Sequence, residues 1–185
     1  MNTETSQLYK MGMAVVDKNK NVNLYSSDQP HQHIDQAKQM ESIMENYLAS
    51  DEGKSLVQYL GSRSKKPIEI KGYGAGDLGE NVVAAVLHDG IEGVILSNYN
   101  GKDFTTRIDE MADKYDLSSD DTMEYVLAHE LAHAAGYKSE AETENVIKEY
   151  FEFMALNSDE NGEKGKYESL AKVAEERCEE AKTYH

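Results

Sequence analysis

Two histidines and a glutamate are the residues of this sequence whose types and spacing can do chemistry. They form an HExxH pattern that runs from His129 through Glu130 to His133. A spacing of four places both imidazoles on one face of a helix, where their nitrogens can bind a single zinc ion. Glu130 is displaced around the helix, so its carboxylate can reach a metal-bound water without binding the metal. The pattern predicts two zinc ligands and a general base.

A hydrolytic zinc site also needs a third protein ligand and an open position for water. A third histidine at the spacing HExxHxxGxxH would be residue 139, which is a serine. The third zinc ligand must therefore be a carboxylate. Glu140 and Glu144 fall on the face of the following helix that must pack inward, where a carboxylate is costly to bury unless it meets a cation. We expect Glu140 to bind zinc and Glu144 to orient a ligand imidazole, with Glu144 as the alternative ligand.

Two helices must position these residues. Ser118 or Ser119 caps the first helix, and Gly136 ends it. Ser139 caps the second helix, and Glu142 three residues later completes a capping box. The sequence therefore predicts an HExxH active-site helix that is followed directly by a glutamate helix.

Short strands and further helices make up the rest of the chain. Apolar runs separated by turns predict two antiparallel hairpins, which pair 8–16 with 22–26 and 81–88 with 93–97. Apolar residues at helical spacing predict helices that start at Pro30 and that cover 56–60, 107–115 and 167–182. A β-prone run predicts a strand at 68–71. The glycine-rich segment 72–80 is expected to turn tightly or move. The fold class is α+β, with a small antiparallel sheet packed on helices.

Composition excludes some partners. The net charge of −16 disfavours nucleic acid and anionic membranes. No run of apolar residues is long enough to span a membrane, and the N-terminus lacks the pattern of a secretory signal, so we expect a cytoplasmic protein. The single cysteine, Cys178, lies on an apolar helical stripe and is expected to be a buried structural thiol rather than a zinc ligand. His31 and His33 are expected at an exposed helix start rather than at a second metal site.

Hydrolysis of an amide needs a hydrogen-bond donor that stabilises the oxyanion. Tyr137, just past the first helix, is the leading candidate for this oxyanion stabiliser, and Tyr150 and His88 are the others. A chain with twelve tyrosines uses most of them for packing, so the residue types alone leave this choice open.

Residues 82–155 resemble the gluzincin zinc metallopeptidases. The resemblance is carried by the HELAH sequence, the glycine after it, and an ExxxE pattern from Glu140 to Glu144. The short connection between the motifs is most similar to the minigluzincins. The resemblance implies that Glu140 is the third ligand, although only six residues separate it from His133. It also implies that the strand at 93–97 is an edge strand that pairs with an extended substrate.

These observations together predict a zinc metallopeptidase, a hydrolase of peptide or protein substrates with one zinc ion and Glu130 as general base, active at neutral or higher pH. We treat residues 1–185 as a single domain, in which 1–80 form a pro- or regulatory part and 81–185 the catalytic core. The resemblance allows a latent form, in which the segment 72–80 or a terminus fills the cleft. The alternative is a latent or non-catalytic, zinc-stabilised regulatory protein.

Overall fold

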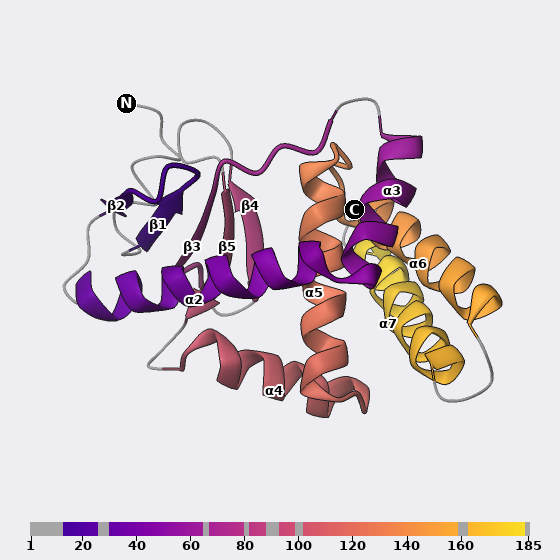
Figure 1. Ribbon diagram of the computed structural model, residues 1–185. Helices are drawn as coiled ribbons and strands as arrows, with labels where there is room; N and C mark the ends of the chain where they lie inside the picture. The colour runs from indigo at the N-terminus through magenta and orange to yellow at the C-terminus, as the bar shows by residue number, and fades with distance from the viewer. Residues whose placement is uncertain are drawn as a thin grey trace. The chain divides into compact units, whose positions relative to one another are not determined.

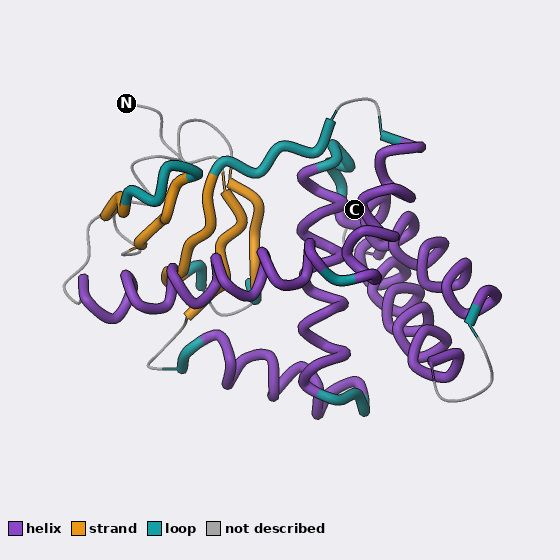
Figure 2. Tube along the Cα trace, viewed as in Figure 1, coloured by secondary structure: helices purple, strands orange, loops and turns teal. Residues whose placement is uncertain are grey.

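The structure is a computed structural model of the 185-residue chain, and it has an α+β fold with five strands and six helices among the residues that it describes (Figures 1 and 2). The described residues are 13–25, 30–64, 67–79, 82–87, 93–98, 102–158 and 163–183. The turn predicted between the strands at 81–88 and 93–97 lies outside them, as does His88.

The chain forms two compact units. The first comprises the described residues of Met1–Ser50 and Glu69–Glu110, and the second those of Asp51–Ile68 and Met111–His185. The single domain that we expected, divided at residue 80 into two parts, stays a prediction. The functional roles that the sequence suggested for residues 1–80 and 81–185 stay predictions.

The first unit holds a five-stranded sheet in the order β2-β1-β3-β5-β4. Its strands are β1 (Met13–Asp17), β2 (Val22–Tyr25), β3 (Gly72–Asp77), β4 (Ala84–Leu87) and β5 (Gly93–Asn98). Both predicted hairpins, β1 with β2 and β4 with β5, are antiparallel as expected. The expectation of a wholly antiparallel sheet was wrong, because β3 pairs with β5 in parallel. The chain passes from β3 to the edge strand β4 and returns beside β3, which makes that pair parallel.

The glycine-rich segment forms strand β3, not the tight turn that we predicted, and the β-prone run 68–71 before it is not a strand. The glycines allow the neighbouring strand to approach closely. A Cβ atom on Gly74 would lie 2.6 Å from the carbonyl oxygen of Ala14 and 2.5 Å from Cδ1 of Ile95. Glycine is therefore required by packing at this position, rather than by a turn.

Strand β5 is not an edge strand. It lies between β3 and β4, and it pairs with both. Because its two backbone edges are already hydrogen-bonded, β5 cannot add a substrate strand, and the expected pairing of residues 93–97 with a substrate was wrong. The edges of the sheet are β2 and β4.

Helix α2 (Pro30–Ala49) lies along one face of the sheet (Figure 1). Ala14 and Val16 of β1 form an apolar cluster with Ala37, and Ile34 packs against it. Met40 continues the buried stripe of the helix. The predicted start at Pro30 and the apolar stripe of this helix are confirmed.

The second unit consists of helices. They are α3 (Asp51–Arg63), α5 (Ser119–Ala134), α6 (Glu140–Asn157) and α7 (Glu163–Thr183), while α4 (Phe104–Tyr115) spans the boundary between the units. Helices α6 and α7 lie side by side (Figure 1). Three aromatic rings stack in the core. The centroid of the Phe151 ring lies 6.3 Å from that of Tyr125 and 6.3 Å from that of Tyr167. This stack joins α5, α6 and α7, the three helices that carry the candidate site.

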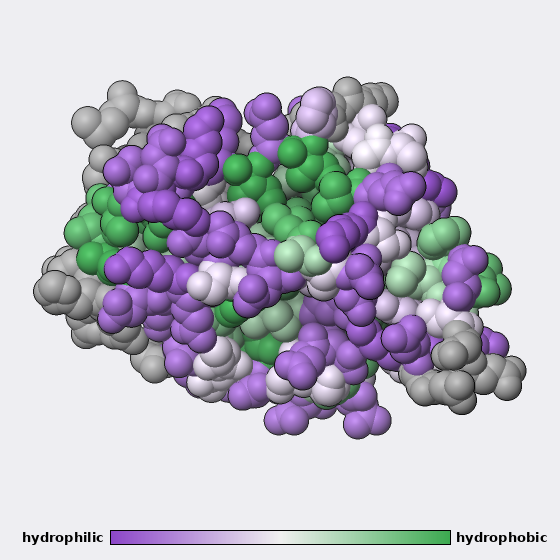
Figure 3. Space-filling view, viewed as in Figure 1, coloured by the Kyte–Doolittle hydropathy of each residue, from purple (hydrophilic) through white to green (hydrophobic). Residues whose placement is uncertain are grey.

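Hydrophilic residues cover much of the visible face in the space-filling view (Figure 3). Among the described residues, no helix combines the length and the apolar character that crossing a bilayer requires.

Candidate metal centre

Helix α5 presents the HExxH residues because both of its ends are fixed by the sequence. Ser118 is the N-cap, and its side chain accepts a hydrogen bond from the backbone N–H of Asp121 at 3.0 Å. Gly136, just after the helix, has a φ of 103°, a conformation that glycine adopts without strain. The predicted cap and stop are therefore confirmed, and His129 and His133 follow each other on one face of the last turns.

Helix α6 brings the glutamates to these histidines. Ser139 is its N-cap, and the capping box with Glu142 is present as predicted. The cap fixes the first turn of α6 directly after the turn that ends α5, so that Glu140 starts the helix and Glu144 lies one turn further along.

The two imidazoles and Glu140 converge on one point. The Nε2 atoms of His129 and His133 are 3.0 Å apart. The carboxylate of Glu140 faces both rings, with Oε2 at 3.2 Å from Nε2 of His129 and Oε1 at 3.5 Å from Nε2 of His133. These three residues form the one group of potential metal ligands found among the described residues.

The outer nitrogens of the two rings lie close to other groups, at hydrogen-bond distance for His133 and at an ion-pair distance for His129. His133 Nδ1 lies 2.9 Å from the carbonyl oxygen of Tyr137, which can only accept, so Nδ1 carries the hydrogen. The hydroxyl of Thr143 is 3.2 Å from the same nitrogen. His129 Nδ1 lies 3.2 Å from Oε1 of Glu144. With a hydrogen on Nδ1 of each ring, both Nε2 lone pairs would point at each other, an arrangement that a metal ion between them or a proton on one Nε2 would satisfy.

The spacing of the three donors fits zinc. Bonds of about 2.0–2.2 Å at tetrahedral angles place the ligand atoms of a zinc ion about 3.3 Å apart. The contacts among His129, His133 and Glu140, at 3.0, 3.2 and 3.5 Å, lie around that value. Nitrogen and oxygen donors of this kind are also those that zinc prefers.

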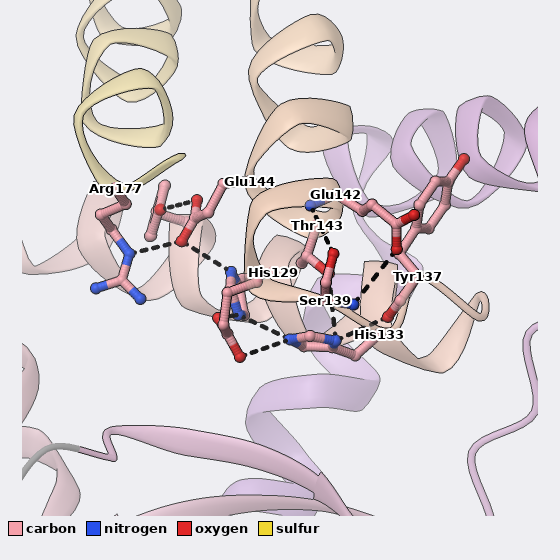
Figure 4. Close-up of polar contacts among 10 residues, drawn as sticks. His129, His133, Tyr137, Ser139, Glu142, Thr143, Glu144 and Arg177 are labelled. Atoms are coloured by element: carbon pink, nitrogen blue, oxygen red, sulfur yellow. Dashed lines mark hydrogen bonds and ion pairs between the residues drawn. The ribbon is translucent and has the colours of Figure 1, made fainter. Parts of the chain in front are cut away.

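Glu144 lies behind His129 and is fixed by two further residues (Figure 4). Arg177 of α7 donates through Nε to Oε1 of Glu144 at 2.6 Å, and the hydroxyl of Tyr125 donates to Oε2. The Glu144 side chain is 1% exposed, whereas that of Glu140 is 60% exposed. The structure thus brings Glu140 to both Nε2 atoms and Glu144 to the outer nitrogen of one ring, as the sequence led us to expect of a ligand and its orienting neighbour.

Glu130 is buried beside this group, with 3% of its surface exposed. Its Oε2 atom has no hydrogen-bond partner among the described residues. Burial raises the pKa of this carboxyl, although the neighbouring histidines oppose the shift. An unpartnered buried carboxylate is costly unless a ligand, a metal or a proton satisfies it.

The electrostatics of the site favour a positive charge. Burial alone would lower the pKa of His129, but hydrogen bonds to Glu140 and Glu144 outweigh it and raise that pKa to about 10. The two histidines in turn hold the pKa of Glu140 far below its usual value. With Glu130, Glu140 and Glu144 ionised, three carboxylates face one guanidinium, that of Arg177. In the metal-free protein the proton that the raised pKa leaves on His129 offsets one of the two excess negative charges, and a divalent cation that displaced this proton would offset both.

The other candidate residues lie elsewhere. The ring of Tyr137 points away from the imidazoles (Figure 4) and lines a cavity whose lining residues include neither histidine. The Tyr150 hydroxyl donates to the carbonyl oxygen of Glu52 at 3.0 Å. Neither phenol is therefore brought to the site, and His88, the third candidate, lies outside the described residues.

Cys178 is buried as predicted, with its sulfur 3.5 Å from the carbonyl oxygen of Ala141. It is not part of the group of potential ligands. The side chain of His31 lies outside the described side chains, so the expectation for His31 and His33 stays a prediction.

Three residues that contact the site were not predicted from the sequence: Tyr125, Thr143 and Arg177. Tyr125 precedes His129 by one helical turn, so the spacing placed it on the same face. Arg177 follows the buried Val173 of α7 by four residues, which is the signal of a charged side chain on a buried face. A charge in such a position needs a partner, and that reasoning could have found Arg177.

Comparison with protein-family models, with curated proteins and with solved structures found no match for this chain. The candidate function therefore rests on the residues and the geometry of the site.

Proposed function

We propose that this protein is a zinc-dependent metallopeptidase of the gluzincin type. The observation that supports the proposal best is the convergence of three donors: two Nε2 atoms 3.0 Å apart, with the carboxylate of Glu140 at 3.2 and 3.5 Å from them. His129, His133 and Glu140 would hold one zinc ion. Bound there, zinc would supply a Lewis acid that lowers the pKa of water and polarises a peptide carbonyl.

Glu130 is the proton carrier of the proposed reaction. Its carboxylate accepts a proton as water attacks the peptide carbonyl, and it passes the proton to the amine that leaves. The unpartnered Oε2 atom supports this role, because no other described residue occupies the lone pairs that must take the proton. Burial, which raises the pKa of Glu130, also favours a group that must bind and release a proton near neutral pH.

Access to the site supports a catalytic centre over a closed structural one. A catalytic zinc site has three protein ligands and an open position, whereas a structural site is closed by four. The ligand group has three members, and the side chain of Glu140 is 60% exposed. The rival function, a latent or non-catalytic zinc-stabilised regulatory protein, requires a fourth protein ligand in the same position.

Peptides and proteins are the proposed substrates. The resemblance to gluzincins suggested this class, and the arrangement of a ligand glutamate one turn before an orienting glutamate supports it. The net charge of −16 makes nucleic acid an unfavourable partner.

The Glu130→Gln variant tests the proposal. Glutamine keeps the shape of the side chain but cannot carry the proton, so cleavage of fluorescent unstructured peptides by zinc-loaded protein should fall by about 10²–10⁴-fold. Zinc content should stay at one ion per chain, since Glu130 is not a ligand. Glu168→Gln, at an exposed position of α7, is the matched control and should cleave normally. Undiminished cleavage by Glu130→Gln would refute the proposed mechanism.

A further inference from the structure

The hydroxyl of Tyr125 is a buried polar group that is connected to the candidate metal centre through Glu144. Tyr125 is 1% exposed, and it lies four residues before His129 on α5. Its hydroxyl donates to Oε2 of Glu144. This contact is two steps away from the proposed zinc ligands, and the reaction proposed above does not use it.

Tyr125 and Arg177 together fix both oxygens of Glu144. Arg177 donates to Oε1 at 2.6 Å, and the same Oε1 lies 3.2 Å from Nδ1 of His129. A turn of the carboxylate about its last side-chain bond would carry Oε1 away from both Arg177 and His129. The hydroxyl on Oε2 blocks this rotation and keeps Oε1 directed at His129.

The aromatic ring of Tyr125 is itself held in place. It stacks on Phe151 at 6.3 Å with an interplanar angle of 20°, and the guanidinium of Arg177 lies 6.0 Å from its centroid. A rigid ring delivers its hydroxyl to one position. The oxygen therefore serves as a fixed point for the carboxylate, rather than as a mobile donor.

We propose that Tyr125 is a positioning residue for the metal centre, which sets the orientation of the His129 imidazole through Glu144. The inference rests on the zinc site of the proposed function. Groups that orient a metal-binding histidine typically change metal affinity by about 10–100-fold when they are removed. Because Tyr125 acts one step further out, we expect the lower end, a loss of about tenfold.

A buried tyrosine hydroxyl can also serve stability alone, and the chain offers a matched control for that role. Tyr150 is fully buried, and its hydroxyl donates to the carbonyl oxygen of Glu52 on α3 at 3.0 Å, rather than to a residue that contacts the histidines. Tyr125→Phe and Tyr150→Phe each remove one oxygen and keep the packed ring. Both should lower the free energy of unfolding, but only Tyr125→Phe should weaken zinc binding.

The experiment measures the zinc dissociation constant of the full chain by competition with a chromophoric chelator. Tyr125→Phe should raise it about tenfold, and Tyr150→Phe should leave it unchanged. The comparison is then repeated in a Glu144→Ala background, where Tyr125→Phe should have no further effect because its route to His129 has been removed. The absorption bands of the cobalt-substituted protein provide a second readout, and they should change in Tyr125→Phe only.

The outcomes separate the two claims. An unmodified chain that binds no zinc would refute both the proposed function and this inference. An unmodified chain that binds zinc, together with equal affinities for Tyr125→Phe and Tyr150→Phe, would overturn the role of Tyr125 and leave the metallopeptidase proposal intact. An equal loss with and without Glu144 would also overturn the proposed route.

Discussion

Arg177→Met removes the cation that neutralises the buried Glu144. Methionine fills much of the space of the arginine stem, so the main change is the loss of the charge and of the 2.6 Å contact to Oε1. Glu144 would keep the Tyr125 hydroxyl and the imidazole of His129 as its partners. We expect the zinc-free protein to lose stability, because a carboxylate that is 1% exposed would be left without its guanidinium.

The magnitude follows from the burial of the two partners. Removal of one member of a buried ion pair costs about 3–5 kcal/mol. The Arg177 side chain is 33% exposed while that of Glu144 is 1% exposed, so solvent screens part of the interaction. We therefore expect the lower end of that range, about 3 kcal/mol. For a chain of this size, the loss corresponds to a decrease in Tm of about 6–12 °C.

Thermal unfolding of the zinc-free protein, followed by far-ultraviolet circular dichroism, measures the effect. Lys148→Met is the matched control, since Lys148 of α6 also pairs with α7, through Glu175 at 2.7 Å. Glu175 is 58% exposed, so the loss of this solvent-screened surface pair should lower the stability far less than the loss of the buried pair. The reasoning would be refuted if Arg177→Met unfolded at the same temperature as Lys148→Met.

Two further predictions concern the metal site and the sheet. Zinc should bind more tightly as the pH rises from about 6.5 to 8.5, because a zinc ion must displace the proton that the pKa of about 10 leaves on His129 of the metal-free protein. The dissociation constant should fall about tenfold per pH unit for each proton released, and a constant value in chelator competition would contradict this. Gly74→Ala should cost about 1–3 kcal/mol in chemical denaturation, because the new Cβ would meet the carbonyl oxygen of Ala14 at 2.6 Å. Gly61→Ala, where no atom lies within 4 Å, should be neutral or slightly stabilising, and equal losses in the two variants would contradict the packing argument.

Local signals in the sequence predicted the helices of the candidate site. Ser118, Gly136 and the capping box of Ser139 with Glu142 act within a few residues of the helix ends, and all appear in the structure. The helix-face argument likewise selected Glu140 and Glu144 as the carboxylates on the inward face of their helix, and the structure brings each to a different nitrogen of His129.

Contacts between distant parts of the chain escaped the sequence analysis. Arg177 is 33 residues from Glu144 along the chain. A local sequence pattern can indicate that a charge is buried, but it does not identify the distant residue that pairs with it. The strand at Gly72–Asp77 was missed for a similar reason. We interpreted its glycines as the sign of a turn. They are needed instead because a side chain at these positions would collide with β1, which packs closely against the strand. The order of the strands also depends on long-range pairing, which placed β5 inside the sheet.

X-ray absorption at the zinc edge of the zinc-loaded protein tests the central claim most directly. If His129, His133 and Glu140 hold the ion, the spectrum should show two imidazoles and oxygen donors at about 2.0–2.2 Å, with no sulfur. A sulfur scatterer at about 2.3 Å would assign Cys178 to the metal, and a third imidazole would exclude Glu140 as the ligand. Either result, or a protein that retains no zinc, would contradict the proposed centre.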